Sequence, residues 1–174
     1  MATTTHPTVP TVPSVPPFAL PPGGGDARWY LGALLEWKAR AGATGGAFSL
    51  VEVTVQPGTE PPLHVHAHED EAYIVLNGRI TFQVGDERVD AEPGSFVFLP
   101  RGVPHGFAVR SEVARAVLLL TPGGLERFFD GWSEPARERT LPPLPDGPPD
   151  VAGLTRDLAA RGVEVVGPPL PALL

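Results

Sequence analysis

Short apolar segments rich in β-branched and aromatic residues recur along the middle of the chain. Glycine, proline, asparagine and aspartate separate them, and these residues end strands and form turns. Within several segments apolar and polar positions alternate, which is the period of a half-buried strand. Many short strands at regular spacing are typical of a β-sandwich or barrel. The expected strands are 47–55, 63–67, 72–76, 79–84, 88–91, 95–99, 105–109 and 113–120.

Three turns are expected between these strands. Asn77–Gly78 predicts a type I′ hairpin, because both central positions of that turn require a positive φ. This hairpin would pair the strand that ends at Leu76 with its return strand. Gly85–Asp86 predicts a second tight turn, and Pro100–Gly102 predicts a turn that brings the chain to His105.

Residues 28–40 carry two patterns at once. A helix is indicated by one set, which recurs every three or four positions: Leu31, Leu34, Leu35 and Lys38. A strand is indicated by another set, which alternates: Trp29, Leu31, Ala33, Leu35 and Trp37. These residues alone leave both interpretations open.

Two short helices are expected after the strands. The segment 125–132 places its leucine and two phenylalanines on one side, and we expect it to cap the barrel. Asp150 is a suitable N-cap for a helix over 151–161, and Gly162 would end that helix. Val151, Leu154 and Leu158 give this second helix a single apolar stripe.

Proline dominates both ends of the chain. Residues 1–25 are rich in Pro and Thr, and frequent proline prevents helix and central strand. We expect a flexible N-terminal arm, with docking of its apolar residues on a partner subunit as the alternative. The expected organisation is this arm, one β-barrel domain over 26–122, and a Pro-rich C-terminal extension with two short helices over 123–174.

Composition excludes several classes of protein. The 174 residues, 42% of them hydrophobic, suffice for one domain with a real core. A net charge of −7 and a single lysine, Lys38, argue against a nucleic-acid partner. The absence of cysteine excludes disulfides, Cys-ligated zinc, iron–sulfur clusters and thiol nucleophiles. No apolar run suits a membrane span or a signal peptide, so a cytoplasmic protein without membrane contact is expected.

Three histidines and one glutamate have spacings that suit a single metal ion. His64 and His66 are two residues apart, so on a strand both side chains point to the same face. Glu71 opens the next strand, where its carboxylate can reach the same point, and folding must bring His105 there. Imidazole nitrogen with carboxylate oxygen suits Fe, Ni, Mn, Co, Cu or Zn and suits Ca or Mg poorly. The alternative is a set of surface or hydrogen-bonded strand residues.

The same residues lie in two stretches that resemble the paired signature motifs of the cupins. The first runs from Gly58 through the two histidines and Glu71 to Gly78, and the second from Gly94 through Pro100–Gly102 to His105. The resemblance implies an all-β cupin fold, the double-stranded β-helix or jelly-roll barrel, and a strand at residues 28–40. It implies four metal ligands: His64, His66, Glu71 and His105.

Two positions differ from the motifs. Val109 stands where the second motif usually ends with asparagine, which affects local turn and pocket polarity and not the metal ligands. His68 is additional to the first motif. Because it lies beside Glu69 and Asp70, we expect a solvated loop histidine, with a role in the pocket as the alternative.

The strand alternation also suggests which residues surround the metal. If Glu71 points inward, Tyr73 and Val75 line the barrel with it, and we add Phe82 and Phe107 from later strands as candidate substrate-pocket residues. Such a pocket is apolar and aromatic and suits a planar or hydrophobic small molecule. A tightly packed small barrel would show the same alternation.

Three functions agree with a His₃Glu site in a barrel. The first is a metal-dependent dioxygenase that uses O₂ on an enolic or phenolic aromatic molecule, with Glu71 as catalytic base. Residues 28–169 resemble the single-domain, quercetin 2,3-dioxygenase-like bacterial cupins, which favours this function. The second is a non-redox isomerase, cyclase or lyase, and the third is a binding protein without turnover. The resemblance also implies a homodimer, which light scattering would test against an 18.4 kDa monomer.

Overall fold

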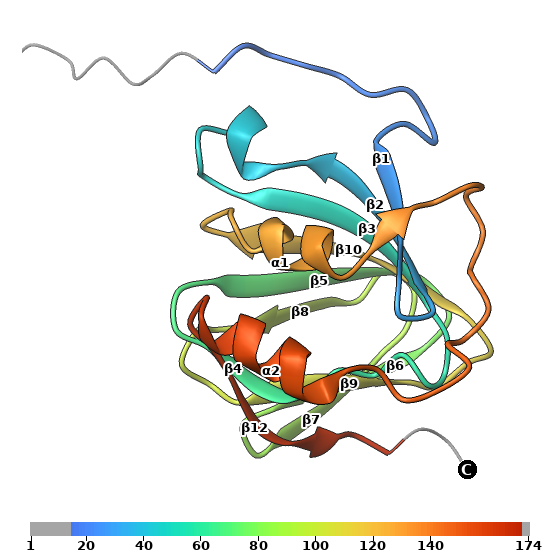
Figure 1. Cartoon of the computed structure of the whole chain (residues 1–174), viewed down its shortest axis with the longest axis vertical. Coiled ribbons are helices and arrows are strands. Elements are labelled where there is room, and N and C mark those ends of the chain that lie inside the picture. Colours follow the sequence, from blue (N-terminus) through green and yellow to red (C-terminus); the bar gives the residue numbers. More distant parts are fainter. Residues whose placement is uncertain (1–14, 172–174) are drawn as a thin grey trace, which may run out of the picture.

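Two antiparallel sheets face each other across an apolar core (Figure 1). The computed structural model describes residues 15–171. All eight strands expected over residues 47–120 are present, with ends that differ by at most two residues. The fold is therefore the all-β jelly-roll barrel that the sequence predicts.

The larger sheet has seven strands within the described residues. Its order across the sheet is β11 (Glu134–Pro135), β1 (Asp26–Tyr30), β2 (Ala33–Ala39), β3 (Ser49–Val55), β10 (Ala114–Thr121), β5 (Asp70–Asn77) and β8 (Phe96–Leu99). A short 3₁₀ helix, η1 (Ala41–Ala43), follows β2. Along β3 and β5 every second side chain is buried, so one face of this sheet forms half of the core.

The smaller sheet has five strands in the described part of the chain. Its order is β12 (Val163–Pro169), β4 (Pro62–His66), β9 (His105–Val109), β6 (Ile80–Val84) and β7 (Glu87–Ala91). The sequence did not predict β12, because its prolines are unusual in a strand. The structure explains them: β12 is an edge strand that pairs only with β4.

The predicted Asn77–Gly78 hairpin is wrong. β5 and β6 belong to different sheets, so the chain crosses from one sheet to the other at this turn. Gly78 has a φ of 75°, and a Cβ added there would lie 2.3 Å from the carbonyl oxygen of Val113. The glycine is needed for its positive φ and for close packing, and neither requires the flanking strands to pair.

Residues 28–40 form strands and not a helix. They supply most of β1 and all of β2, which pair through a turn at Leu31–Gly32 whose φ values are 47° and 89°. Asn and Gly favour such turns. Because a leucine occupies the first position here, no typical hairpin signal marks the division of this segment into two strands. The predicted turn at Gly85–Asp86 is confirmed between the paired strands β6 and β7.

Both expected helices are present. α1 (Glu126–Gly131) buries Phe128, and α2 (Val151–Ala159) begins after Asp150, whose carboxylate accepts a hydrogen bond from the Gly153 amide. α2 ends just before Gly162, which has a φ of 80°. Neither helix in the described chain has the length and apolar character needed to cross a bilayer.

The predicted N-terminal arm lies partly outside the described residues, which begin at Val15. Residues 15–22 have no helix or strand, and Val15, Phe18 and Leu20 are exposed. Figure 1 shows this segment passing over η1 at the top of the molecule before the chain turns down into β1.

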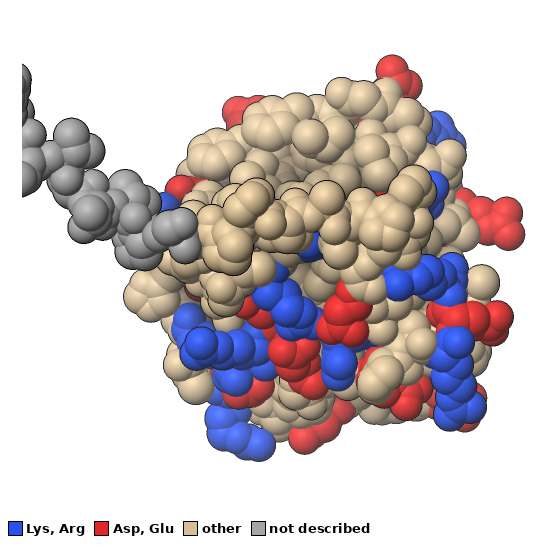
Figure 2. Space-filling view, turned by 90° about the horizontal axis from the view of Figure 1, so that it is seen from above, with Lys and Arg blue, Asp and Glu red and all other residues tan. Residues whose placement is uncertain are grey.

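Charges on the outside of the larger sheet are paired and not gathered by sign. Glu36 forms ion pairs with Lys38 and Arg139, and Glu52 forms ion pairs with Lys38 and Arg115. On the face seen in Figure 2, basic and acidic side chains are intermixed in the same way. This surface does not provide the basic patch that nucleic-acid binding requires.

Substitution of Phe82 tests the assignment of the hydrophobic core. Its side chain is 0% exposed, so Phe82→Ala should lower the free energy of unfolding by about 3–5 kcal/mol through lost burial and the cavity left behind. Phe96→Ala is the matched control, because Phe96 is 64% exposed and should change stability by less than about 0.5 kcal/mol. Urea denaturation measures both, and equal effects would contradict the assigned core.

Candidate metal centre

Three histidines of the smaller sheet point to one place between the sheets. His64 and His66 share a face of β4, and His64 lies directly opposite His105 on the paired strand β9. The ring centroids of His64 lie 5.0 Å from His66 and 4.6 Å from His105. The i, i+2 spacing and the strand register together gather the three imidazoles.

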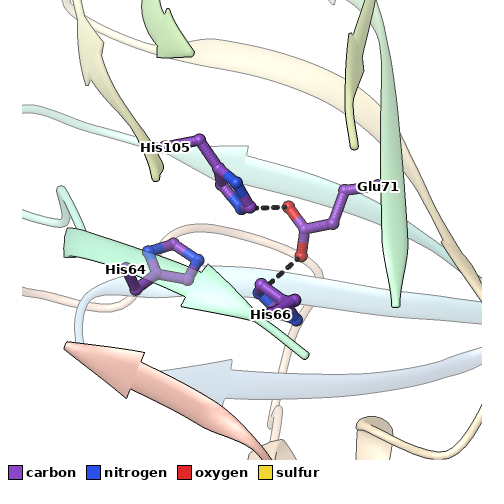
Figure 3. Close-up of side chains that lie close together, drawn as sticks. All are labelled: His64, His66, Glu71 and His105. Atoms are coloured by element: carbon purple, nitrogen blue, oxygen red, sulfur yellow. Dashed lines mark ion pairs between the residues drawn. The ribbon is translucent and has the colours of Figure 1, made fainter. Parts of the chain in front are cut away.

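Glu71 reaches the histidines from the opposite sheet. It is buried near the start of β5, and its two carboxylate oxygens lie 3.4 Å from Nε2 of His66 and 3.7 Å from Nε2 of His105. Figure 3 shows this carboxylate between the two rings. One ligand atom from each of the four residues fits within 4.8 Å. The structure therefore brings together all four residues that the sequence singled out.

Backbone hydrogen bonds hold two of the rings in one tautomer. Nδ1 of His64 lies 2.8 Å from the Pro62 carbonyl oxygen, and Nδ1 of His105 lies 2.9 Å from the Val103 carbonyl oxygen. A carbonyl only accepts, so both Nδ1 atoms donate and both Nε2 atoms keep a lone pair. Fixed Nδ1–H donors are the usual support of metal-binding histidines.

Glu69 gives His66 the same support, and sequence reasoning missed it. Its carboxylate lies 3.2 Å from Nδ1 of His66, and the side chain is buried. The sequence placed Glu69 in an acidic, solvated turn. Its position three residues after a candidate ligand and just before β5 was the available signal, but only the structure shows that it turns inward.

Burial and neighbouring charges separate the pKa values of the three imidazoles. Burial, with the nearby His105 and His66, lowers the pKa of His64 to about 3. Burial likewise lowers the pKa of His105. Burial opposes protonation of His66 too, but its hydrogen bond to Glu69 and the charges of Glu71 and Glu69 raise its pKa overall. In the ion-free site, His66 is therefore the ring that most readily holds a proton.

The donor set fits a transition-metal ion. Nε2 of His105 is buried and has no hydrogen-bond partner among the described residues, although buried polar atoms are normally paired. Three imidazole nitrogens and a carboxylate oxygen suit Zn²⁺ or a first-row metal such as Fe, Ni, Mn, Co or Cu. The cluster could hold one such ion, and its composition does not select among them.

Two neighbouring residues lie outside the cluster. His68 is exposed, in agreement with the loop interpretation. Arg101 forms two side-chain hydrogen bonds to Asp70, at 2.6 and 3.0 Å. The Arg101 guanidinium lowers the pKa of Asp70 to about 2. This surface ion pair joins the turn before β9 to the start of β5.

A cavity of about 590 Å³ adjoins the cluster between the sheets. His64, His66 and Glu71 contribute to its wall, together with Tyr73 and Phe107 from the candidate pocket residues. Val75 and Phe82 do not line it and are packed in the core instead. Apolar residues from both sheets, α1, α2 and the segment 144–149 form most of the remaining wall.

Charge is scarce in the cavity wall. Besides the cluster itself, Glu60 is the only ionisable acidic residue that lines it, and neither Lys nor Arg of the described chain does. Tyr73 adds a phenol whose pKa is raised by burial and by the Glu71 charge, so it stays neutral. The cavity therefore suits an uncharged, apolar molecule and offers no cation for a phosphate group.

Sequence comparison relates this chain to known proteins. A family model described as a cupin domain matches residues 51–122. The chain is 26% identical over 127 residues to the quercetin 2,3-dioxygenase of Bacillus subtilis, covering 73% of this chain and 38% of that protein. It is 33% identical over 91 residues to an uncharacterised protein of Streptomyces coelicolor, covering 52% of this chain and 81% of that protein. The chain thus spans well under half of the dioxygenase.

Solved structures share the fold. A predicted oxalate decarboxylase from Thermotoga maritima aligns with a TM-score of 0.54 and 17% identity, over 60% of this chain and 99% of that one. A sugar phosphate isomerase from Silicibacter pomeroyi aligns with a TM-score of 0.51 and 20% identity, over 59% of this chain and 74% of that one. The jelly-roll topology, the motif match and these relatives agree, and the chain belongs to the cupin superfamily.

Proposed function

We propose that this cupin is a metal-dependent dioxygenase that acts on an enolic or phenolic aromatic molecule. One divalent transition-metal ion would be held by His64, His66, Glu71 and His105, with Glu71 also acting as the catalytic base. The observation that carries the proposal is the position of this ligand set, which opens onto a large, mostly apolar cavity. The similarity to a quercetin 2,3-dioxygenase supports the choice of reaction.

The residues suit deprotonation of an acidic hydroxyl. Glu71 carries a cavity-lining carboxylate beside the imidazoles and can accept the hydroxyl proton of an enol or phenol. Tyr73, two residues further along the same face of β5, stays protonated and provides an aromatic wall beside the reacting group. When bound, a redox-active ion supplies Lewis acidity toward the substrate oxygen and electron transfer with O₂.

The composition of the cavity wall also helps to distinguish the proposed reaction from other reactions. Sugar phosphates carry charge that needs a cation, and the described cavity wall contains neither Lys nor Arg. An apolar substrate converted without O₂, by an isomerase, cyclase or lyase, would use the same ligands with the ion only as a Lewis acid. Oxygen consumption separates that reaction from the proposed one.

The proposal is tested by elemental analysis of the purified protein together with O₂ uptake. We expect close to one transition-metal ion per chain and O₂ consumption that depends on added quercetin or another enolic aromatic. A bound metal without O₂ uptake in the presence of quercetin or the other enolic aromatics would contradict the dioxygenase and favour a non-redox or binding role. A protein that binds no transition metal would contradict the metal centre.

Glu71→Gln should reduce turnover by at least about 100-fold, because the amide cannot accept the substrate proton. The melting temperature should change little, since the replacement keeps the shape of the side chain. His68→Ala is the control, because His68 is exposed beside the same strand, and it should keep its activity. Steady-state O₂ uptake measures both variants. A fully active Glu71→Gln protein would show that Glu71 is not the catalytic base.

Glu69→Gln should weaken metal binding by about 10- to 100-fold, the usual effect of losing an acceptor behind a ligating histidine. The amide is a weaker acceptor than the carboxylate now 3.2 Å from Nδ1 of His66. Competition with a chromophoric chelator measures the affinity, and His68→Ala again provides the control. Unchanged affinity for Zn²⁺ or Ni²⁺ would show that Glu69 does not position His66 for metal binding.

Metal binding should release about one proton from the histidines at pH 6.5. At that pH the raised pKa of His66 favours its protonated form, the pKa of His64, about 3, leaves that ring neutral, and the lowered pKa of His105 favours its neutral form. Affinity should therefore fall about tenfold per pH unit below the His66 pKa, because one proton competes with the ion. Calorimetry in buffers with different ionisation enthalpies counts the protons, and two or three would contradict this protonation pattern.

A further inference from the structure

The cavity beside the metal centre has one thin wall. Most residues that line it are buried or partly buried side chains of the two sheets and the two helices. In the described chain, Gly58 and Pro169 are exposed wall residues, and the others that are exposed gather in one stretch: Leu144, Pro145, Gly147, Pro149 and Val151. A residue that lines the cavity and is also exposed separates the cavity from solvent. The boundary is therefore thinnest along this stretch, just before α2 and at its start.

Residues 143–149, called here the strap, have little backbone hydrogen bonding. Four of the seven are proline, which has no amide hydrogen to donate. Residues 143–148 form no backbone–backbone hydrogen bond within residues 15–171. Most of the remaining wall comes from paired strands and from helices, whose backbone hydrogen bonds would break if they separated. The strap is therefore the part of the wall that can move at the lowest cost.

The chain is fixed on both sides of the strap. Before it, Nε2 of Gln56 donates a hydrogen bond of 3.1 Å to the carbonyl oxygen of Pro142. After it, the Asp150 carboxylate accepts a hydrogen bond from the Gly153 amide and so fixes the start of α2. Figure 1 shows the segment, in orange, running down one side of the molecule between β11 and α2. A segment held only at its ends can swing outward while both sheets stay folded.

Leu144 holds the middle of the strap against the rest of the wall. A Cβ atom added to Gly32 would lie 2.7 Å from Cδ2 of Leu144, and one added to Gly58 would lie 3.3 Å from Cδ1. The leucine side chain thus packs into a notch that exists because both glycines lack a side chain. Gly32 lies in the β1–β2 turn and Gly58 in the loop between β3 and β4. Because Leu144 is still 44% exposed, its contacts keep the strap closed without burying it in the core.

We propose that the strap is a lid over the cavity, which Leu144 keeps closed and which opens to admit an uncharged, apolar small molecule. His66, Glu71 and His105 are buried, so a molecule that reaches them must pass through the cavity wall. Opening requires that Leu144 leaves its notch and that the chain between Pro142 and Asp150 swings outward. This inference concerns access to the site and goes beyond the proposed function. It is the same whether the admitted molecule is oxidised, isomerised or only bound.

Thiol labelling of the full-length protein tests the lid, because the chain has no cysteine and an introduced thiol is the only one. Val53→Cys places the thiol in the buried cavity wall, and Phe96→Cys places it on the exposed outer surface. The reagent is 4,4′-dithiodipyridine, a neutral aromatic disulfide, and the thiopyridone that it releases is followed by absorbance. The Val53→Cys thiol should react at least about 100-fold more slowly than the Phe96→Cys thiol, because it reacts only when the lid opens.

Leu144→Ala should increase the reaction rate of the Val53→Cys thiol about tenfold, because loss of the half-buried leucine contacts favours the open lid. The rate of the Phe96→Cys thiol should not change. Asp146→Ala is the matched control, because Asp146 is an exposed strap residue that does not line the cavity. Its rate should stay within about twofold of the parent. Urea below the unfolding transition should affect the labelling rates only weakly, because lid opening exposes little surface.

Four results would overturn the lid. A Val53→Cys thiol that reacts as fast as the Phe96→Cys thiol would show that the cavity is always open. An unchanged rate in Leu144→Ala, including no reaction in either protein, would show that Leu144 does not hold the wall closed. An equal increase in Asp146→Ala, or a urea dependence equal to that of global unfolding, would show general loosening or unfolding. None of these readouts involves O₂ uptake, so the lid and the proposed dioxygenase can fail independently.

Discussion

The candidate metal centre depends on one constraint, which is that the two sheets face each other in a fixed register. Three imidazoles come from the smaller sheet and the Glu71 carboxylate from the larger one, so neither sheet alone contains the site. The β4–β9 pairing sets His64 opposite His105. Because a shift of one residue in β4 would turn its histidines away from the core, the same hydrophobic alternation that closes the barrel also aims the ligands.

Much of this arrangement was predictable from the sequence, and the failures have physical causes. The i, i+2 spacing of His64 and His66 and the expected strands needed only local patterns. The Asn77–Gly78 error arose because a positive φ is a local property, whereas the sheet that the next strand joins is not. Glu69 was missed because its environment depends on how the turn packs beneath His66, and no local pattern records that contact.

The cavity extends from the metal centre to side chains of β1, β2 and α1. Strand alternation predicted an aromatic wall, and Tyr73 and Phe107 do line the cavity, but Val75 and Phe82 belong to the packed core. Alternation fixes the face of a sheet and cannot distinguish a side chain beside a cavity from one packed against others. Part of the wall comes from β1, β2 and α1, which lie outside the motif residues and extend the cavity beyond the four ligands.

The most direct test of the central claim is X-ray absorption spectroscopy of the metal-loaded protein. We predict a first shell of nitrogen and oxygen, with zinc–nitrogen distances of about 2.0–2.1 Å, and outer-shell scattering from three imidazoles. His105→Ala should reduce the imidazole count to two without changing that of a His68→Ala control. A shell of oxygen alone, or an imidazole count unaffected by His105→Ala, would contradict the metal centre described here.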